Sequence, residues 1–226
     1  MAGLIGATCV AAIVSFFVCG IPFGMIFAAK LSGIDVRKTG SGNIGMTNVA
    51  RSAGGKAAAL TFLCDVGKGV VCVLLGKLVI ANLCCGGDWF AVAYNGAFGW
   101  VGSVLFAASV FGHIFSPYLH FHGGKGISVG LGAGLAMWWP IGLGMLVVFL
   151  LCTIPTRYVS LGSICAAASL PIQAALWGMS VPAVIPTAMV AAVVIWSHRE
   201  NIGRLVRGEE RRFSIKHKDK NKGGSR

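Results

Sequence analysis

The stretch GSGNIGMTNVARSAGGK, residues 40–56, has the composition of a loop that binds an anion. It contains five glycines, two asparagines, small hydroxyl residues and two cations, but no carboxylate. Successive backbone N–H groups of a glycine-rich loop form a concavity that binds anions, and a guanidinium matches the geometry of phosphate. A flexible polar loop is the alternative interpretation. The expected phosphate ligands here are Ser41, Gly42, Asn43, Gly45, Thr47, Asn48 and Arg51.

A second stretch, HFHGGKGISVG at residues 120–130, places a lysine between glycines directly before a predicted helix. The N-terminus of a helix binds phosphate through its free N–H groups and its dipole. The sequence therefore predicts further phosphate ligands at Gly123, Gly124, Lys125 and Gly126. Three histidines lie nearby, at 113, 120 and 122, but they are not spaced as a helical pair of metal ligands, so we expect no metal site.

Two further polar stretches follow, PTRYVSLGSI at 155–164 and HRENIGRLVRGEERRF at 198–213. The first supplies Ser160 and Ser163 where a loop enters a helix, although helix capping and contact with lipid headgroups would explain its polar residues equally well. In the second, His198 and Asn201 are three residues apart and share one face of a helix. Attraction to a membrane surface explains many of its cations, but it does not explain that histidine and asparagine.

The rest of the chain indicates a membrane protein with several helical spans. Of its 226 residues, 56% are hydrophobic and only 12% are charged, with a mean hydropathy of +0.79. A soluble domain carries about 25% charged residues, and a span needs ~20 mostly apolar residues. We expect an all-α fold with seven transmembrane helices, the first of which is a retained span rather than a cleaved signal peptide. The expected spans are residues 4–29, 57–81, 89–112, 126–139, 141–154, 159–178 and 182–197, with a turn at Pro140.

The distribution of lysine and arginine predicts the orientation of these spans. Cations occur in the connections after the first, third, fifth and seventh spans, whereas 82–88, 139–140 and 178–182 contain none. Cytoplasmic loops are enriched in Lys and Arg. We therefore expect the N-terminus outside and the C-terminus in the cytoplasm, with all four polar stretches on the cytoplasmic face.

Two other features have less specific interpretations. Eight cysteines are present but no C-x-x-C, so we expect free thiols that are small buried apolar residues, without disulfide or metal. Asp65 and Lys68 lie three apart within the second span, and an ionisable residue at that depth is a candidate functional site. It provides the best support for an alternative function, a transporter or exchanger of organic phosphates. An intrahelical ion pair facing other helices is the preferred interpretation.

The blocks GSGNIGMTNVAR, DVGKG, HGGKG, TRYVSLGSI and HRENIGRLVRGEERRF together resemble the bacterial PlsY family, the acyl-phosphate-dependent glycerol-3-phosphate acyltransferases. The resemblance extends from the first span to about Phe213. Two departures are Met46, where the family usually has alanine, and a basic extension over 214–226. We therefore divide the chain into an integral membrane acyltransferase domain, 1–213, and a basic cytoplasmic tail, 214–226.

The resemblance implies that an acyl phosphate donates its acyl group to the 1-hydroxyl of sn-glycerol 3-phosphate, giving lysophosphatidic acid and inorganic phosphate, the first acylation of phospholipid synthesis. Coenzyme A is not used, and no histidine here begins the H-x-x-x-x-D box of other glycerol-phosphate acyltransferases. The catalytic residues it implies are Ser41, Arg51, Lys125, His198 and Asn201.

In this scheme the first loop holds the donor phosphate, and Arg51, Lys125, His198 and Asn201 bind glycerol phosphate with Ser160 or Ser163, although the reverse division remains open. A groove between spans holds the acyl chain. The general base is either His198 or the donor phosphate, with the phosphate preferred. Expected partners are the two substrates and membrane lipids, with no cofactor, nucleic acid or obligatory protein partner. The expected location is the bacterial cytoplasmic (inner) membrane.

Overall fold

The computed structural model describes residues 1–212, so the predicted basic tail lies outside the described part of the chain. Residues 1–212 contain no strand, which confirms the all-α fold class. The α-helices are α1 Ala2–Gly20, α2 Phe23–Ser32, α3 Met46–Ala53, α4 Gly55–Cys84, α5 Trp100–Ile114, α6 Ile127–Met137, α7 Trp139–Thr156, α8 Val159–Leu176, α9 Val181–Ser197 and α10 Arg199–Val206. Three 3₁₀ turns are η1 Val36–Lys38, η2 Trp89–Val92 and η3 Pro117–Leu119.

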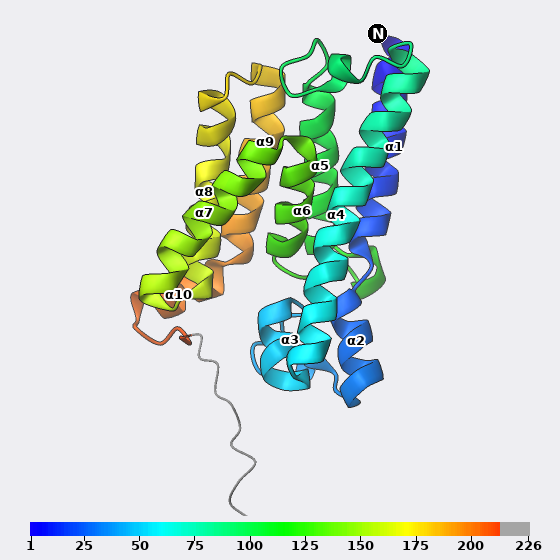
Figure 1. Cartoon of the computed structure of the whole chain (residues 1–226). Helices are drawn as coiled ribbons and strands as arrows, with labels where there is room; N and C mark the ends of the chain where they lie inside the picture. Colours follow the sequence, from blue (N-terminus) through cyan, green and yellow to red (C-terminus); the bar gives the residue numbers. More distant parts are fainter. Residues whose placement is uncertain (213–226) are drawn as a thin grey trace, which may run out of the picture.

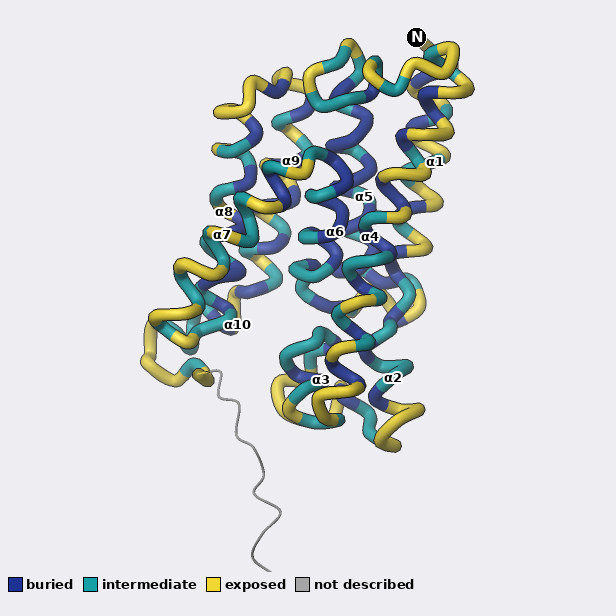
Figure 2. The backbone as a smooth tube through the Cα atoms, viewed as in Figure 1, coloured by how far each residue is buried: buried dark blue, intermediate teal, exposed yellow. Residues whose placement is uncertain are grey.

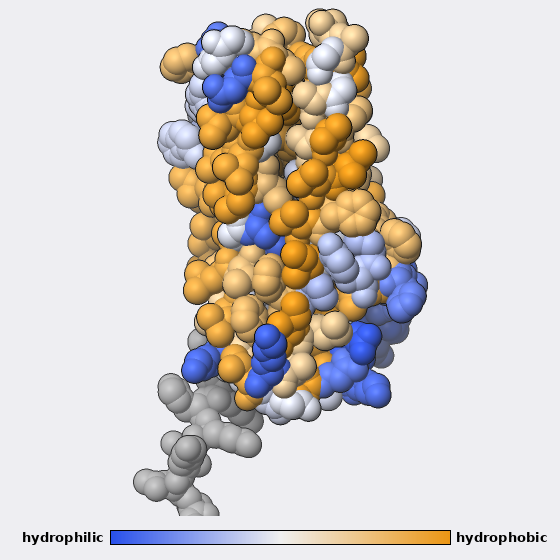
Figure 3. Space-filling view, turned by 90° about the vertical axis from the view of Figure 1, so that its right-hand side faces the viewer, coloured by the Kyte–Doolittle hydropathy of each residue, from blue (hydrophilic) through white to orange (hydrophobic). Residues whose placement is uncertain are grey.

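Five helical segments of the described chain are long and apolar enough to cross a membrane, or six if the bent pair of α9 and α10 forms one span. Helix α6 has 11 residues and is only ~16 Å long at 1.5 Å per residue. That length is about half of a bilayer core of ~30 Å. On the face shown in Figure 3, the surface along the long helices is largely apolar, and the largest group of hydrophilic residues lies toward the lower end, with smaller groups at the upper end and in the middle. The molecule is therefore an integral membrane protein with polar surface concentrated at one end.

The first and third predicted spans begin and end differently in the structure. The segment predicted at 4–29 is interrupted at Ile21–Pro22, which separates α1 from α2, because proline has no N–H to continue the helical hydrogen bonds. The span predicted to begin at 89 begins only at Trp100. Residues 93–99 instead form turns at which glycines fit tightly: a side chain at Gly96 or Gly99 would collide with carbonyl oxygens of residues 90–94.

The prediction of a turn at Pro140 is also wrong, by two residues. The chain reverses at Trp138, which has an extended backbone with φ −157° and ψ 109°. Pro140 lies in the first turn of α7, where its missing N–H would have no helical partner in any case. The two short helices themselves, α6 and α7, confirm the prediction that residues 127–154 do not form one straight span.

The four polar stretches lie at one end of the bundle, the end that carries α2, α3 and α10 (Figure 1). The connections without lysine or arginine lie at the opposite end, with the N-terminus. Helix α5 occupies the centre of the bundle, and its Val101, Leu105, Phe106 and Val110 are fully buried. Along the outer helices, buried residues face inward and exposed ones face outward (Figure 2). This arrangement gathers chemically active residues at one end of an apolar bundle.

Buried charges and cysteines complete the interior. Lys68 Nζ lies 2.7 Å from Asp65 Oδ1, and both side chains are buried, so the predicted intrahelical ion pair is confirmed. All eight cysteines are free thiols. Only Cys19 and Cys72 are buried. The prediction of burial is wrong for the others, because an apolar side chain on a membrane helix also fits against lipid, as for the exposed Cys9 on α1.

Candidate functional site

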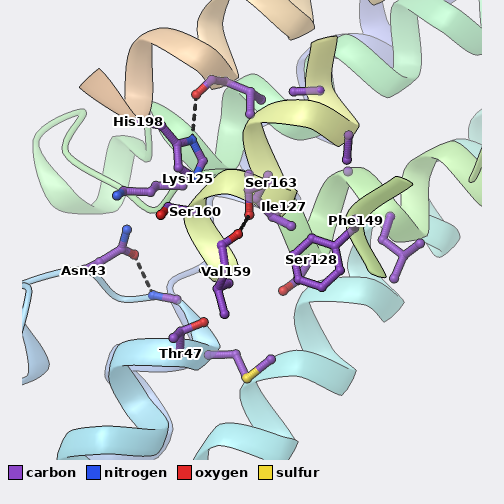
Figure 4. A pocket seen from close by; sticks show the side chains of 18 of the residues that line it. Asn43, Thr47, Lys125, Ile127, Ser128, Phe149, Val159, Ser160, Ser163 and His198 are labelled. Atoms are coloured by element: carbon purple, nitrogen blue, oxygen red, sulfur yellow. Dashed lines mark hydrogen bonds between the residues drawn. The ribbon is translucent and has the colours of Figure 1, made fainter. Parts of the chain in front are cut away.

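A cavity of about 440 Å³ lies between the helices and reaches residues of all four polar stretches. Its polar lining comes from residues far apart in the sequence. In Figure 4, the side chains of Lys125, Ser160 and His198 lie close together, with Asn43 and Thr47 on the neighbouring wall. Of the predicted site residues, the cavity is lined by Ser41, Asn43, Gly45, Thr47, Asn48, Arg51, Lys125, Gly126, Ser160, Ser163, His198 and Asn201. Gly42, Gly123 and Gly124 are not among its lining residues.

The remainder of the cavity is apolar and extends into the bundle. Its walls include Phe106 and Val110 of α5, Leu131 of α6, Met145, Leu146 and Phe149 of α7, Leu170 of α8, and Val190 and Val194 of α9. Leu170 lies 11 residues beyond Val159, the first residue of α8, which corresponds to a depth of ~16 Å. The cavity therefore joins a charged mouth to an apolar interior of the kind that accommodates a hydrocarbon chain.

The first polar stretch is not a single loop, because it contains the short helix α3. Asn48 on that helix is buried, and its amide nitrogen donates to the carbonyl oxygens of Val36, Thr39 and Asn43, at 3.0, 3.1 and 2.8 Å. Its Oδ1 accepts a hydrogen bond from the N–H of Ser41 at 3.0 Å. These four bonds hold the stretch in shape. Asn48, predicted as a phosphate ligand, therefore has its side chain engaged within the loop.

Neighbouring residues of this stretch leave more groups for a ligand. Asn43 Oδ1 accepts from the N–H of Gly45 at 2.7 Å, a bond drawn in Figure 4, so the amide nitrogen of Asn43 remains for other contacts. Gly42 has φ +71°, a conformation that favours glycine, and it shapes the turn without lining the cavity. Ser41, Thr47 and the exposed Arg51 line the mouth.

The second stretch presents its lysine rather than its first two glycines. The N–H of Gly123 donates to Ile114 O at 2.9 Å, and the N–H of Gly124 donates to His113 O at 3.1 Å. These amides therefore fasten the loop to the end of α5 and are not directed at the cavity. Gly126, with φ +79°, precedes α6 and lines the cavity together with Lys125.

A hydrogen-bonded chain joins Lys125 to the fourth stretch. Lys125 Nζ donates to Asn201 Oδ1, and Asn201 Nδ2 donates to Glu210 Oε1 at 2.7 Å. Burial, which is the largest cause, and the neighbouring Arg204 lower the pKa of Lys125 to about 8. The ammonium is thus costly to keep charged without an anion, which favours the binding of phosphate.

Glu210 is a site residue that the sequence interpretation missed. Its Oε1 also accepts from Ser160 Oγ at 2.8 Å, and its Oε2 accepts from Arg204 Nε at 2.8 Å. Burial raises the pKa of Glu210, but the hydrogen bonds from Arg204, Asn201 and Ser160 lower it by more. The net pKa is below its usual value, and the carboxylate remains ionised. The signal was present in the motif GEERRF, but nothing in the sequence says which of its two glutamates folds back onto the site.

His198, immediately after α9, is held in one tautomer. Its Nδ1 lies 2.8 Å from Val194 O (Figure 4), and because a carbonyl only accepts, Nδ1 carries the hydrogen and Nε2 has the free lone pair. Burial lowers the pKa of His198 to about 4, outweighing the bond to Val194, so the ring is neutral at pH 7. Ser163 Oγ donates to Val159 O at 2.8 Å, which leaves its lone pairs toward the cavity.

In a helical membrane protein, a cavity that joins a charged mouth to an apolar interior is typical of integral membrane enzymes that act on lipids. The model of the family described as glycerol-3-phosphate acyltransferase matches residues 9–208. The chain belongs to this family. The glycerol-3-phosphate acyltransferase of Rubrobacter xylanophilus is 40% identical over 193 residues, covering 85% of this chain and 88% of that protein. The enzyme of the same name from Trichlorobacter lovleyi is 41% identical over 199 residues, 88% of this chain and 94% of that protein.

Solved structures agree with this assignment. The crystal structure of PlsY (YgiH), an integral membrane glycerol 3-phosphate acyltransferase, in its glycerol 3-phosphate form has a TM-score of 0.78 to this chain. It is 35% identical and covers 92% of this chain and 96% of its own. The lysophosphatidic acid form of PlsY gives a TM-score of 0.76 at 34% identity. The sequence resemblance to the PlsY family is therefore confirmed.

Proposed function

We propose that this protein transfers a fatty acyl group from acyl phosphate to the 1-hydroxyl of sn-glycerol 3-phosphate, giving lysophosphatidic acid and inorganic phosphate. Membership of the family supports glycerol 3-phosphate as the acceptor. The observation that carries the proposal is the continuity between a charged mouth and an apolar interior within one cavity. A phosphate head in the mouth and an acyl chain in the interior place the carbonyl carbon between them.

We assign the two phosphates to neighbouring walls of the mouth. Ser41, Thr47 and the amide of Asn43 receive the donor phosphate on the wall formed by the first stretch and α3. Glycerol phosphate binds at the wall where the Lys125 ammonium, Asn201 and Ser160 meet, and Arg51 reaches it from the mouth. Preorganised cations and N–H groups then stabilise the charge that develops on the carbonyl oxygen and on the leaving phosphate.

The reaction needs an acceptor for one proton. The 1-hydroxyl oxygen attacks the acyl carbonyl carbon, the bond from that carbon to the phosphate oxygen breaks, and the hydroxyl proton moves to the departing phosphate. His198 is a weak base, because its conjugate acid has a pKa of about 4, whereas a phosphate monoester dianion has a conjugate pKa of ~6. The neutral His198 instead accepts a hydrogen bond from a glycerol hydroxyl through Nε2 and orients it.

The arrangement of the cations supports a membrane orientation for this site. Counting α6 and α7 as two crossings gives seven, with the N-terminus outside and the polar end in the cytoplasm. In the bacterial inner membrane, glycerol phosphate then enters from the cytoplasm and the donor arrives from the bilayer. No protein partner is needed for either substrate in this scheme.

The test is an assay of purified protein in lipid with palmitoyl phosphate and glycerol 3-phosphate, with palmitoyl-CoA as a parallel donor. We expect equal amounts of lysophosphatidic acid and phosphate from the acyl phosphate, and no product from the CoA ester. Arg51→Ala should reduce the rate, whereas Arg157→Ala, an exposed arginine at the same end that does not line the cavity, should not. Binding of glycerol phosphate without either product would refute the proposal and favour the transport alternative.

A further inference from the structure

The DVGKG motif, residues 65–69 in the middle of α4, has no role in the chemistry proposed above. Its Asp65 and Lys68 side chains are 3% and 4% exposed. The Lys68 ammonium is close to three acceptors: Asp65 Oδ1 at 2.7 Å, Ile21 O at 2.8 Å and His113 Nδ1 at 3.2 Å. A buried charge of this kind is costly unless all its hydrogen bonds are satisfied, so these partners must be held in place.

His113 on α5 connects this charge to the loop that carries the site lysine. Because an ammonium only donates, Nδ1 of His113 accepts from Lys68, and the hydrogen of the neutral ring lies on Nε2. That nitrogen lies directly against Gly124, where any side chain would collide with it. The carbonyl of the same histidine accepts from the N–H of Gly124 at 3.1 Å. The ring and the backbone of His113 therefore both support the residue that precedes Lys125.

The glycine of the motif supports the start of α6 on the other side of that loop. A side chain at Gly69 would meet the carbonyl oxygen of Val129 and the N–H of Ala133. In return, a side chain at Gly132 would meet the carbonyl oxygen of Val66. Helices α4 and α6 thus approach to backbone contact directly after the loop, and this fixes where α6 begins.

We infer that Asp65, Lys68 and Gly69 of α4, together with His113 of α5, form a buried platform that positions Lys125 for glycerol phosphate. We give all four a positioning role because they act on Lys125 through the 123–126 loop. Lys68 and Gly69 do not line the cavity, whereas Asp65 and His113 also line it. The inference rests on the proposed role of Lys125 as a phosphate ligand. The three acceptors of Lys68 come from the α1–α2 break, α4 and α5, so one ammonium joins the elements that surround the loop.

Lys77 is a matched control on the same helix. It is also a buried lysine, and its ammonium lies 3.4 and 3.3 Å from the carbonyl oxygens of Ala136 and Met137, and over the ring of Trp89. These partners stand at the far end of α6, away from the loop. Replacing either lysine removes one buried charge from α4, but only Lys68 is connected through His113 to the 123–126 loop.

The experiment compares Lys68→Met with Lys77→Met in the purified full-length enzyme. We expect Lys68→Met to raise KM for glycerol 3-phosphate about tenfold or more, since small displacements of a positioned group cost such factors, and to leave KM for the acyl phosphate unchanged. Amide hydrogen exchange of a peptide covering 114–126 should become faster in Lys68→Met alone. Equal effects of the two variants on this KM, or no effect of Lys68→Met on exchange of the loop, would overturn the inference.

Two further variants keep the inference testable if Lys68→Met does not fold or if Lys125 does not bind phosphate. If Lys68→Met does not fold, His113→Ala keeps the Asp65–Lys68 pair but removes the ring against Gly124, and we expect the same changes in KM and in exchange. Lys125→Gln tests the proposed role of Lys125 as a phosphate ligand independently of the platform. If it leaves KM for glycerol phosphate unchanged, the phosphate assignment of Lys125 fails. If it raises KM while His113→Ala changes neither KM nor exchange, the platform fails.

Discussion

Lys125 should make the binding of glycerol 3-phosphate dependent on pH in the alkaline range. Burial lowers its pKa from 10.5 to about 8, so in the free enzyme the ammonium loses its proton above that pH. The substrate phosphate, with a second pKa of ~6, remains a dianion throughout this range. The proton that is lost therefore belongs to the enzyme, and only the protonated lysine attracts the phosphate.

The size of the effect follows from the titration of one group. Above pH 8, kcat/KM for glycerol 3-phosphate should fall tenfold per pH unit, or about 30-fold by pH 9.5, because this ratio reports the free enzyme. At saturating glycerol phosphate the fall should begin at higher pH, since a bound dianion favours the charged lysine. The charged groups that act on Lys125 are Arg199, Glu200, Arg204 and Glu210.

The assay measures initial rates of lysophosphatidic acid formation from pH 6.5 to 9.5 at saturating acyl phosphate. Lys125→Arg is the control, because a guanidinium remains protonated and its profile should stay flat. The reasoning would be refuted by a flat profile in the wild type, or by an equal alkaline fall in Lys125→Arg.

Three more predictions concern other parts of the cavity. Glu210→Gln replaces an ionised acceptor of three hydrogen bonds and should raise KM for glycerol phosphate about tenfold, as expected for a bond to a charged group. The exposed Glu209→Gln is the control and should leave this KM unchanged. Equal effects of the two variants in steady-state kinetics would contradict the prediction. Asn48→Ala leaves three carbonyls and one N–H without their partner and should lower unfolding free energy by about 1–3 kcal/mol, measured by thermal unfolding in detergent; an unchanged midpoint would refute it. Leu170→Trp should shift donor preference toward shorter acyl chains in competition assays, whereas Ile172→Trp, 60% exposed on the outside of α8, should leave it unchanged, and a shift in both would argue against Leu170 as the inner wall.

The parts of the fold that could be predicted are those that depend on local composition. Apolar length predicted the helices, and the distribution of cations predicted that four separate stretches would gather at one end. Helix boundaries were less predictable where backbone packing decides them. Pro140 marked a turn in the sequence, yet the chain reverses at Trp138 because proline is readily accepted in the first turn of a helix.

Within the site, the residue types predicted which residues lie near the cavity better than they predicted what each residue does there. Lys125, His198 and Asn201 line one cavity as expected. Gly123 and Gly124 do not, because their N–H groups bond to carbonyls at the end of α5, which no local pattern reveals. For the same reason the sequence could not show that Glu210 accepts bonds from Ser160 and Asn201, since these contacts join residues 50 and 9 positions apart.

The cavity has a polar mouth and an apolar interior, so the concentrations of the two proposed substrates must be expressed in different ways. In the reaction proposed above, the acceptor comes from water and the chain-bearing donor from the bilayer, so the site responds to two different measures of amount. For the acceptor the relevant quantity is molarity in the aqueous phase, and for the donor it is the fraction of the surrounding lipid or detergent that the donor represents. Adding inert lipid at a fixed bulk amount of donor should therefore slow the reaction, although nothing in the water has changed.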